Sequence, residues 1–174
     1  MAITKIQSES LNLADTYDFT GTVTGAGESN APSFSTNKTS GSISFSVNTA
    51  TKLVFDNELY DTASAYDTST GRFTVPSGQG GKYHFSASFL SYEQANNNIS
   101  SWYIYFYKNG SNELFLTKGE TANHGSYRPN MLAADINLSA GDYIELYARV
   151  QTSGTARVEV SPGYNRFSGF KVST

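Results

Sequence analysis

The chain has 174 residues, a mass of 18.9 kDa and a net charge of −3, and it contains no cysteine. Its length suits one domain with a short appendage, and because only 16% of the residues are charged, no basic field is available to attract nucleic acid or anionic lipid. The missing cysteines exclude disulfides, thiolate nucleophiles and cysteine-ligated metals.

The sequence carries no sign of export or of a membrane span. Residues 1–7 lack the apolar run of a signal peptide, and no stretch approaches the ~20 apolar residues of a membrane-spanning helix. We therefore expect neither a cleaved leader nor membrane insertion. Twelve tyrosines and eleven phenylalanines, among abundant Ser, Thr, Gly and Asn, are typical of strands and turns, so helix is expected to be scarce.

Residues 1–30 differ from the rest of the chain, because their apolar residues are scattered among small and polar ones. Such a segment cannot form its own core. It is either a disordered tail or an extended arm that orders only against another chain or surface, and we favour the arm. Its candidate anchoring residues are Ile3, Ile6, Leu11, Leu13, Tyr17 and Phe19.

Residues 31–174 are predicted to form one all-β domain. Short strand-like runs alternate with turn signals at the spacing of a two-sheet antiparallel sandwich. The predicted strands are 33–36, 42–47, 52–55, 72–75, 82–91, 102–108, 113–118, 131–138, 143–151, 156–161 and 165–172.

Turn signals and side-chain alternation refine this prediction. Asn109-Gly110 favours a tight hairpin turn, because both residues readily take positive φ angles. In 143–150, Ile144, Leu146 and alternate residues after them form an apolar face, which predicts one buried and one outward side. In 102–107 both faces are aromatic, and Tyr103, Tyr105 and Tyr107 share one of them.

Several short motifs carry a family resemblance. They are Tyr66-Asp67, Gly71-x-Phe73, Pro76, Gly81-x-Tyr83-x-Phe85, Leu138-Ser139-Ala140-Gly141-Asp142 and Phe167-Ser168-Gly169-Phe170. Their order resembles that in the globular heads of complement component 1q, a family that shares its fold with tumour necrosis factor. The resemblance spans about residues 34–172.

The resemblance implies a jelly-roll sandwich that assembles as a compact, non-enzymatic homotrimer used for binding. Outward aromatics fit a subunit contact, because a lone head would expose them to water. Candidate interface residues are Tyr83, Phe85, Tyr143, Tyr147 and Phe170.

Three landmarks of the motifs have physical reasons of their own. Gly71 can supply a turn conformation that is costly for a residue with a Cβ, and Pro76 can end a strand without needing a backbone donor. Gly169 can let a neighbouring ring or backbone approach closely.

The chain departs from the animal members of the family. It has no cysteine after Phe73, no collagen-like stalk and no signal peptide, which puts secreted complement-type or hormone-type roles in doubt. The segments 3–7 and 17–27 resemble instead the leader segments of structural proteins of tailed bacteriophages.

Few residues point to chemistry, and we expect no enzyme and no cofactor. His84 is expected to be a hydrogen-bonded structural or interface residue, and at a trimer axis it could act as a pH switch. Asp56, Glu58, Asp61 and Asp67 could supply oxygens to calcium, although their spacing matches no recognised calcium loop, and solvated loop charges are the simpler interpretation.

The tyrosines 103, 105 and 107 allow two interpretations. They could stack on sugar rings as a glycan-binding strip, or they could cover a subunit contact and pack beneath loops.

These observations favour a non-enzymatic virion structural protein. It would be a trimeric capsid decoration protein at the virion surface, assembled in the host cytoplasm and anchored to a capsid or tail protein through residues 1–30. The alternative is a tail-fibre tip or lectin-like module that binds a host surface or glycan.

Overall fold

The computed structural model describes residues 32–93, 99–110, 112–125, 127–161 and 163–173. The expected arm of residues 1–30, with its anchoring residues, lies outside the described residues. The predicted domain of residues 31–174 therefore provides all the structure discussed below.

The described residues form twelve strands. They are β1 (Ser33–Asn37), β2 (Thr51–Lys52), β3 (Asn57–Asp61), β4 (Tyr66–Asp67), β5 (Arg72–Thr74), β6 (Gly81–Tyr92), β7 (Ile99–Lys108), β8 (Asn112–Gly125), β9 (Tyr127–Leu138), β10 (Tyr143–Gln151), β11 (Arg157–Val158) and β12 (Arg166–Ser173).

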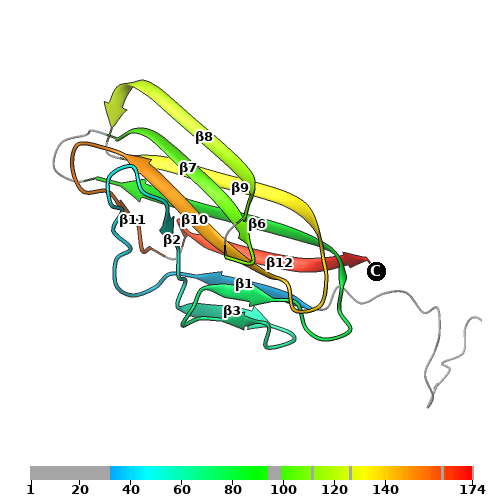
Figure 1. Cartoon of the computed structure of the whole chain (residues 1–174). Coiled ribbons are helices and arrows are strands. Elements are labelled where there is room, and N and C mark those ends of the chain that lie inside the picture. The colour runs from blue at the N-terminus through cyan, green and yellow to red at the C-terminus, as the bar shows by residue number, and fades with distance from the viewer. Residues whose placement is uncertain (1–31, 94–98, 111, 126, 162, 174) are drawn as a thin grey trace, which may run out of the picture.

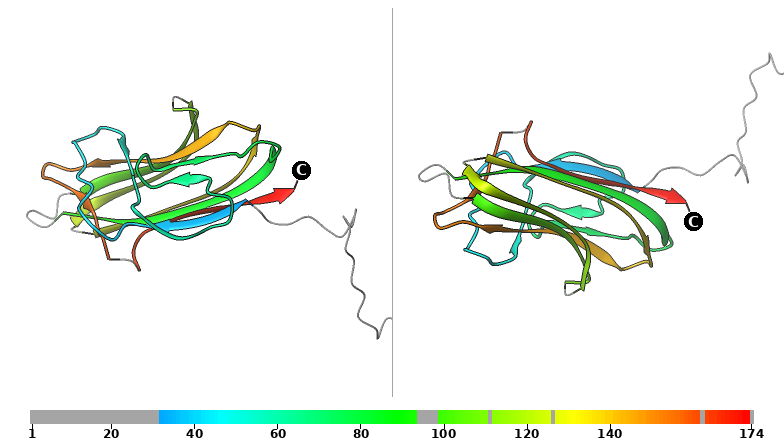
Figure 2. Two further views of the ribbon diagram at one scale, coloured as in Figure 1. Left: turned by 90° about the horizontal axis from the view of Figure 1, so that it is seen from below. Right: turned by 90° about the horizontal axis from the view of Figure 1, so that it is seen from above.

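The strands form two antiparallel sheets that pack face to face (Figure 1). In the first sheet β6 lies between β9 and β12, β11 pairs with the end of β6, and the sheet continues through β1 to β3. In the second sheet the order is β4, β5, β10, β7, β8, and β2 also pairs with β10. Figure 2 shows the two layers from two further sides. The predicted all-β, two-sheet antiparallel sandwich is confirmed.

Alternation along the long strands decides which side chains are buried. Ile144, Leu146, Ala148 and Val150 of β10 are all fully buried, as their period-two pattern predicts. The hairpin after β7 is also confirmed, because Asn109 and Gly110 have φ angles of 53° and 77°.

An aromatic cluster joins the two sheets at the centre of the core. The Phe34 ring of β1 stacks on the Phe73 ring of β5 with centroids 4.8 Å apart, and meets the Phe167 ring of β12 edge-on at 5.0 Å. Phe85 of β6 contacts both Phe73 and Phe106 of the second sheet. The family motifs are therefore mainly core residues, and such aromatic pairs add stability beyond simple burial.

Both glycine landmarks have the roles expected of them. Gly71 has a φ of 68° and lies against the backbone of residues 53 and 54, where a Cβ would approach Val54 Cα to 3.0 Å. At Gly169 a Cβ would lie 2.6 Å from Phe85 Cδ1 and 3.0 Å from the His84 carbonyl oxygen. The Phe85 ring therefore occupies the space beside position 169 of β12 that any side chain other than glycine would fill.

Several predicted strand bounds were wrong. Residues 42–47 form only an isolated bridge between Ser44 and Arg157, and 52–55 and 156–161 shrink to β2 and β11. The short strands β3 and β4 were missed because their sequences do not alternate. Strands β8 and β9 extend far beyond 113–118 and 131–138, because pairing with β7 and β6 continues through polar residues that carry no apolar signal.

Replacing Gly169 by alanine should destabilise the domain, because the new methyl group would clash with the Phe85 ring. We expect a loss of about 1–3 kcal/mol, the usual range for overpacking a tight core, measured by urea unfolding. Gly163→Ala is the matched control, because no atom lies within 4 Å of a Cβ at that position. Equal losses in the two variants would contradict this account of Gly169.

Candidate functional site

The acidic residues proposed for calcium bind separate local donors. Asp61 accepts hydrogen bonds from the backbone N–H groups of Ala63 and Tyr66, at 3.0 and 2.7 Å. Hydrogen bonds from Ser69 and Thr70 lower the pKa of Asp67 to about 2. No group of three or more His, Cys, Asp or Glu residues that could hold a metal occurs among the described residues.

Asp56 is also engaged locally. Its carboxylate pairs with Lys38 at 3.0 Å and accepts hydrogen bonds from the residue 39 backbone and the Ser40 hydroxyl. Burial raises the pKa of Asp56, but these hydrogen bonds and the Lys38 charge outweigh it and hold the pKa well below its usual range. The three carboxylates thus tie down loops and do not converge on one point.

His84 lies on the outward side of β6 and bonds across the sheet. Its Nδ1 is 2.7 Å from the Asp135 carboxylate of β9, and its ring lies 5.3 Å from that of Phe170 on β12. The prediction of a hydrogen-bonded histidine is confirmed. A pH switch at this position stays a prediction.

We call the outward surface of β6, β9 and β12 the first-sheet face. Cross-strand pairs arrange it in rows, including Asp135 with His84 and Phe170, then Ala133 with Ser86 and Ser168, then Met131 with Ser88 and Arg166. Its large apolar side chains are exposed to different extents: Met131 by 70%, Tyr127 by 51%, Val172 by 47% and Phe170 by 37%.

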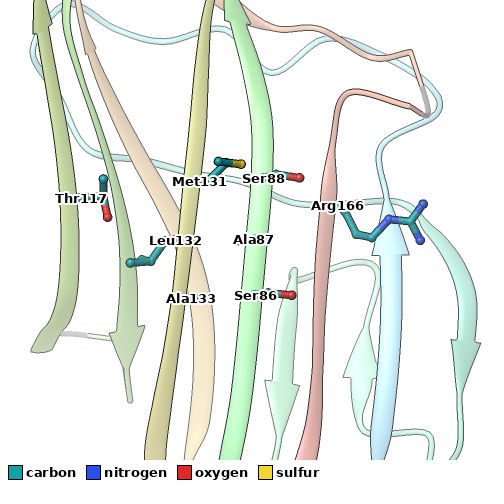
Figure 3. Close-up of a pocket in the computed structure, with 8 residues that line it drawn as sticks. All are labelled: Ser86, Ala87, Ser88, Thr117, Met131, Leu132, Ala133 and Arg166. Atoms are coloured by element: carbon teal, nitrogen blue, oxygen red, sulfur yellow. The ribbon is translucent and has the colours of Figure 1, made fainter.

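Small side chains make the centre of the first-sheet face shallow. A groove of about 420 Å³ runs along β6 and β9 and reaches Thr117 of β8 and Arg166 of β12 (Figure 3). Ser86, Ser88 and Ala133 line it, with Met131 on β9 beside them. Small residues flanked by exposed apolar ones fit a neighbouring protein surface.

The outward surface of the second sheet is different, and we call it the tyrosine face. Its three rows are Lys118–Tyr103–Arg149, Tyr105–Tyr147–Lys52 and Tyr107–Glu145–Arg72, with Tyr143 at one end. Tyr107 and Tyr147 stack with centroids 4.2 Å apart, and the Arg72 guanidinium lies 3.7 Å from the Tyr143 ring centroid. Aromatic rings and cations therefore alternate on this face.

A buried carboxylate organises one end of the tyrosine face. The Glu145 side chain is 2% exposed, and its Oε1 binds both Lys52 and the Arg72 guanidinium, the latter at 3.0 Å. Because the two cations remain partly exposed, their charges are balanced by Glu145 without being fully removed from water.

Comparison with known proteins identifies the domain. Residues 33–172 match the C1q domain. The chain belongs to the C1q domain family. Its members share the tumour necrosis factor jelly roll, which is typically non-enzymatic, and they typically form homotrimers.

Solved structures agree with this C1q fold. The globular domain of zebrafish complement 1qA has 14% identity and a TM-score of 0.59, covering 82% of this chain and 98% of that one. Murine APRIL at pH 5.0 has 14% identity and a TM-score of 0.61, with 80% and 98% covered. Eiger TNF from S. frugiperda has 13% identity and a TM-score of 0.61, with 81% and 92% covered. No curated protein matches the sequence.

The C1q sandwich corrects some of the proposed site residues. Tyr83 and Phe85 are fully buried inside the chain, so their side chains have no surface to offer a partner subunit. Tyr143 and Tyr147 lie on the tyrosine face, whereas Phe170 lies on the first-sheet face. Their role in a subunit contact stays a prediction. Tyr105 is only 4% exposed and cannot offer its ring to a sugar.

Sequence reasoning missed Tyr127 and Met131 of the first-sheet face and Lys118 of the tyrosine face. Alternation in 143–150 placed Glu145 and Arg149 on the outward side but gave them no role. Period-two alternation through 127–137 would have placed Tyr127 and Met131 on one side.

Across the described ranges, no helix has the length and apolar character needed to cross a membrane.

Glu145→Gln should destabilise the domain, because Lys52 and Arg72 would lose the charge that holds them together. We expect about 2–3 kcal/mol, less than the ~3–5 kcal/mol for breaking a fully buried pair, because both cations reach water. The measurement is the urea midpoint. Glu120→Gln, which breaks an exposed pair with Lys118, is the control and should cost less than about 1 kcal/mol. A Glu145 effect as small as the control would refute this role.

Proposed function

We propose that this C1q domain is a homotrimeric, non-enzymatic interaction protein whose subunits meet through the first-sheet face. The single observation that carries the proposal is the exposure of Met131, Tyr127, Phe170 and Val172 on one sheet surface. A monomer would leave this apolar surface in water, whereas neighbouring copies would bury it. Of the interface candidates, Phe170 belongs to this surface.

Burial of the first-sheet face leaves the tyrosine face pointing away from the contact, because the two faces belong to opposite layers of the sandwich (Figure 2). Tyr143 and Tyr147 are then outward residues of the assembled head. Binding of a further partner would use this second surface.

Met131→Asp should break the trimer, because an aspartate on the first-sheet face would be buried without a partner. Light scattering of the full chain should give three times the 18.9-kDa subunit mass for the natural protein and a lower mass for the variant. Tyr164→Asp is the control, since Tyr164 is exposed on a loop outside the face, and its mass should be unchanged. A natural chain that has one subunit's mass would overturn the trimer.

We further propose that the trimer is a virion decoration protein anchored by residues 1–30. Support comes from the resemblance of segments 3–7 and 17–27 to phage leader segments. Three arms on one trimer would bind a capsid or tail protein multivalently, so weak individual contacts would add up to firm attachment. The head would then stand at the virion surface.

Deleting residues 2–27 should abolish incorporation into virions while leaving a folded trimer, because the deletion removes the proposed anchor and keeps all twelve described strands, the first of which begins at Ser33. Incorporation is measured by immunoblot of purified particles, and the trimer by light scattering. Particles that still carry the truncated protein would refute the anchoring role.

A second candidate function is host or glycan recognition, as in a tail-fibre tip or lectin-like module. The observation that favours it is the tyrosine face, with half-buried rings and cations on a surface free of the proposed contact. A cell-binding assay with purified trimer separates the two candidates, because a pure decoration protein would not bind host cells.

A further inference from the structure

One row of the tyrosine face combines an aromatic ring with two cations. Strand register sets Tyr103 of β7 between Lys118 of β8 and Arg149 of β10. The Arg149 Cζ lies 3.9 Å from the ring centroid, and the Lys118 Nζ lies 5.5 Å from it. The stacked guanidinium is held in one orientation before any ligand arrives, which lowers the entropy cost of binding.

Among the described residues, one of the two cations in the Lys118–Tyr103–Arg149 row pairs with a carboxylate, whereas both Lys52 and Arg72 at the other end of the tyrosine face do. Lys52 and Arg72 share the Glu145 carboxylate, and Lys118 pairs with the exposed Glu120. Arg149 has no ion pair within the described part of the chain, and its buried Nε makes no hydrogen bond there. An arginine partly removed from water without a carboxylate is a favourable partner for an incoming anion.

Lys118 and Arg149 also affect the pKa of the Tyr103 hydroxyl. Burial raises the pKa of Tyr103. Hydrogen bonds to Ser101, Lys118 and Arg149 and the positive charge of Lys118 lower it by more, so the pKa lies below its ordinary value. Negative charge is therefore stabilised at this end of the face, although the whole chain has a net charge of −3.

We propose that the row Lys118–Tyr103–Arg149 binds a carboxylate of an acidic sugar chain. The Arg149 guanidinium would donate to the carboxylate, and Lys118 would add a second donor. Half-buried Tyr147 lies one row along and stacks on Tyr107 of the row after it. Their flat apolar rings and hydroxyl groups suit the C–H faces and hydroxyls of sugar rings.

Sugar fits this surface better than nucleic acid. A nucleic acid backbone is bound through many phosphate contacts, whereas this row supplies two cations, Arg149 and Lys118, and Lys118 is shared with Glu120. Because the tyrosine face must be open in the assembled head, the site rests on the trimer arrangement of the proposed function.

The test is calorimetric titration of the full chain with a linear oligomer of galacturonic acid. We expect binding that weakens as salt rises, that is lost with the methyl-esterified oligomer, and that falls at least tenfold in Arg149→Gln. Arg157→Gln is the matched control, because Arg157 is an exposed arginine on β11 of the other sheet, and its affinity should be unchanged.

Several results would overturn the site. They are no binding of the oligomer, equal binding of its methyl ester, an Arg149→Gln affinity equal to that of Arg157→Gln, or stronger binding of oligothymidylate or of a polyglutamate peptide. Urea midpoints of both variants verify that each is folded. Light scattering of the same samples separates the two proposals. Galacturonate binding by a monomer would refute the trimer and keep the site. A trimer that does not bind galacturonate would refute the site and keep the trimer.

Discussion

Packing of the Phe34 ring against Phe73 and Phe167 ties the two sheets together, and the rest of the molecule depends on it. Phe85 completes the cluster only because Gly169 leaves room for its ring. The inward positions of β6, β7, β9 and β10 are likewise filled mainly by buried apolar side chains. Function must therefore reside on the two outward surfaces, on loops or outside the sandwich, which agrees with the typically non-enzymatic character of the C1q fold.

The two outward surfaces have opposite chemistry because their strands alternate differently. On β6, β9 and β12 the outward positions hold small and apolar side chains, and only a few charged groups such as Asp135 lie among them. On β7 and β10 the outward positions hold tyrosines, Arg149 and Glu145. Hydrophobic burial therefore favours contact between copies on the first surface, whereas aromatic and ionic groups suit a polar ligand on the second.

The sequence predicted the sandwich well, since period-two alternation in β10 and turn residues such as Asn109-Gly110 are local signals. It predicted the interface residues poorly. Alternation with Lys82, His84 and Ser86 places Tyr83 and Phe85 on the apolar side of β6, where both are fully buried, so the period-two pattern could have identified them as core. The Lys118–Tyr103–Arg149 row could not be found in this way, because its members are far apart in the chain and strand register alone brings them together.

The central claim is that the first-sheet face is covered in the assembled protein while the tyrosine face stays open. Met131 reports on it directly, because its side chain is 70% exposed in the single chain. We would measure the rate at which peroxide oxidises Met131 in the native full-length protein and in urea-unfolded protein. Strong protection of Met131 in the native protein is the predicted result. Oxidation as fast as in the unfolded chain would contradict the account.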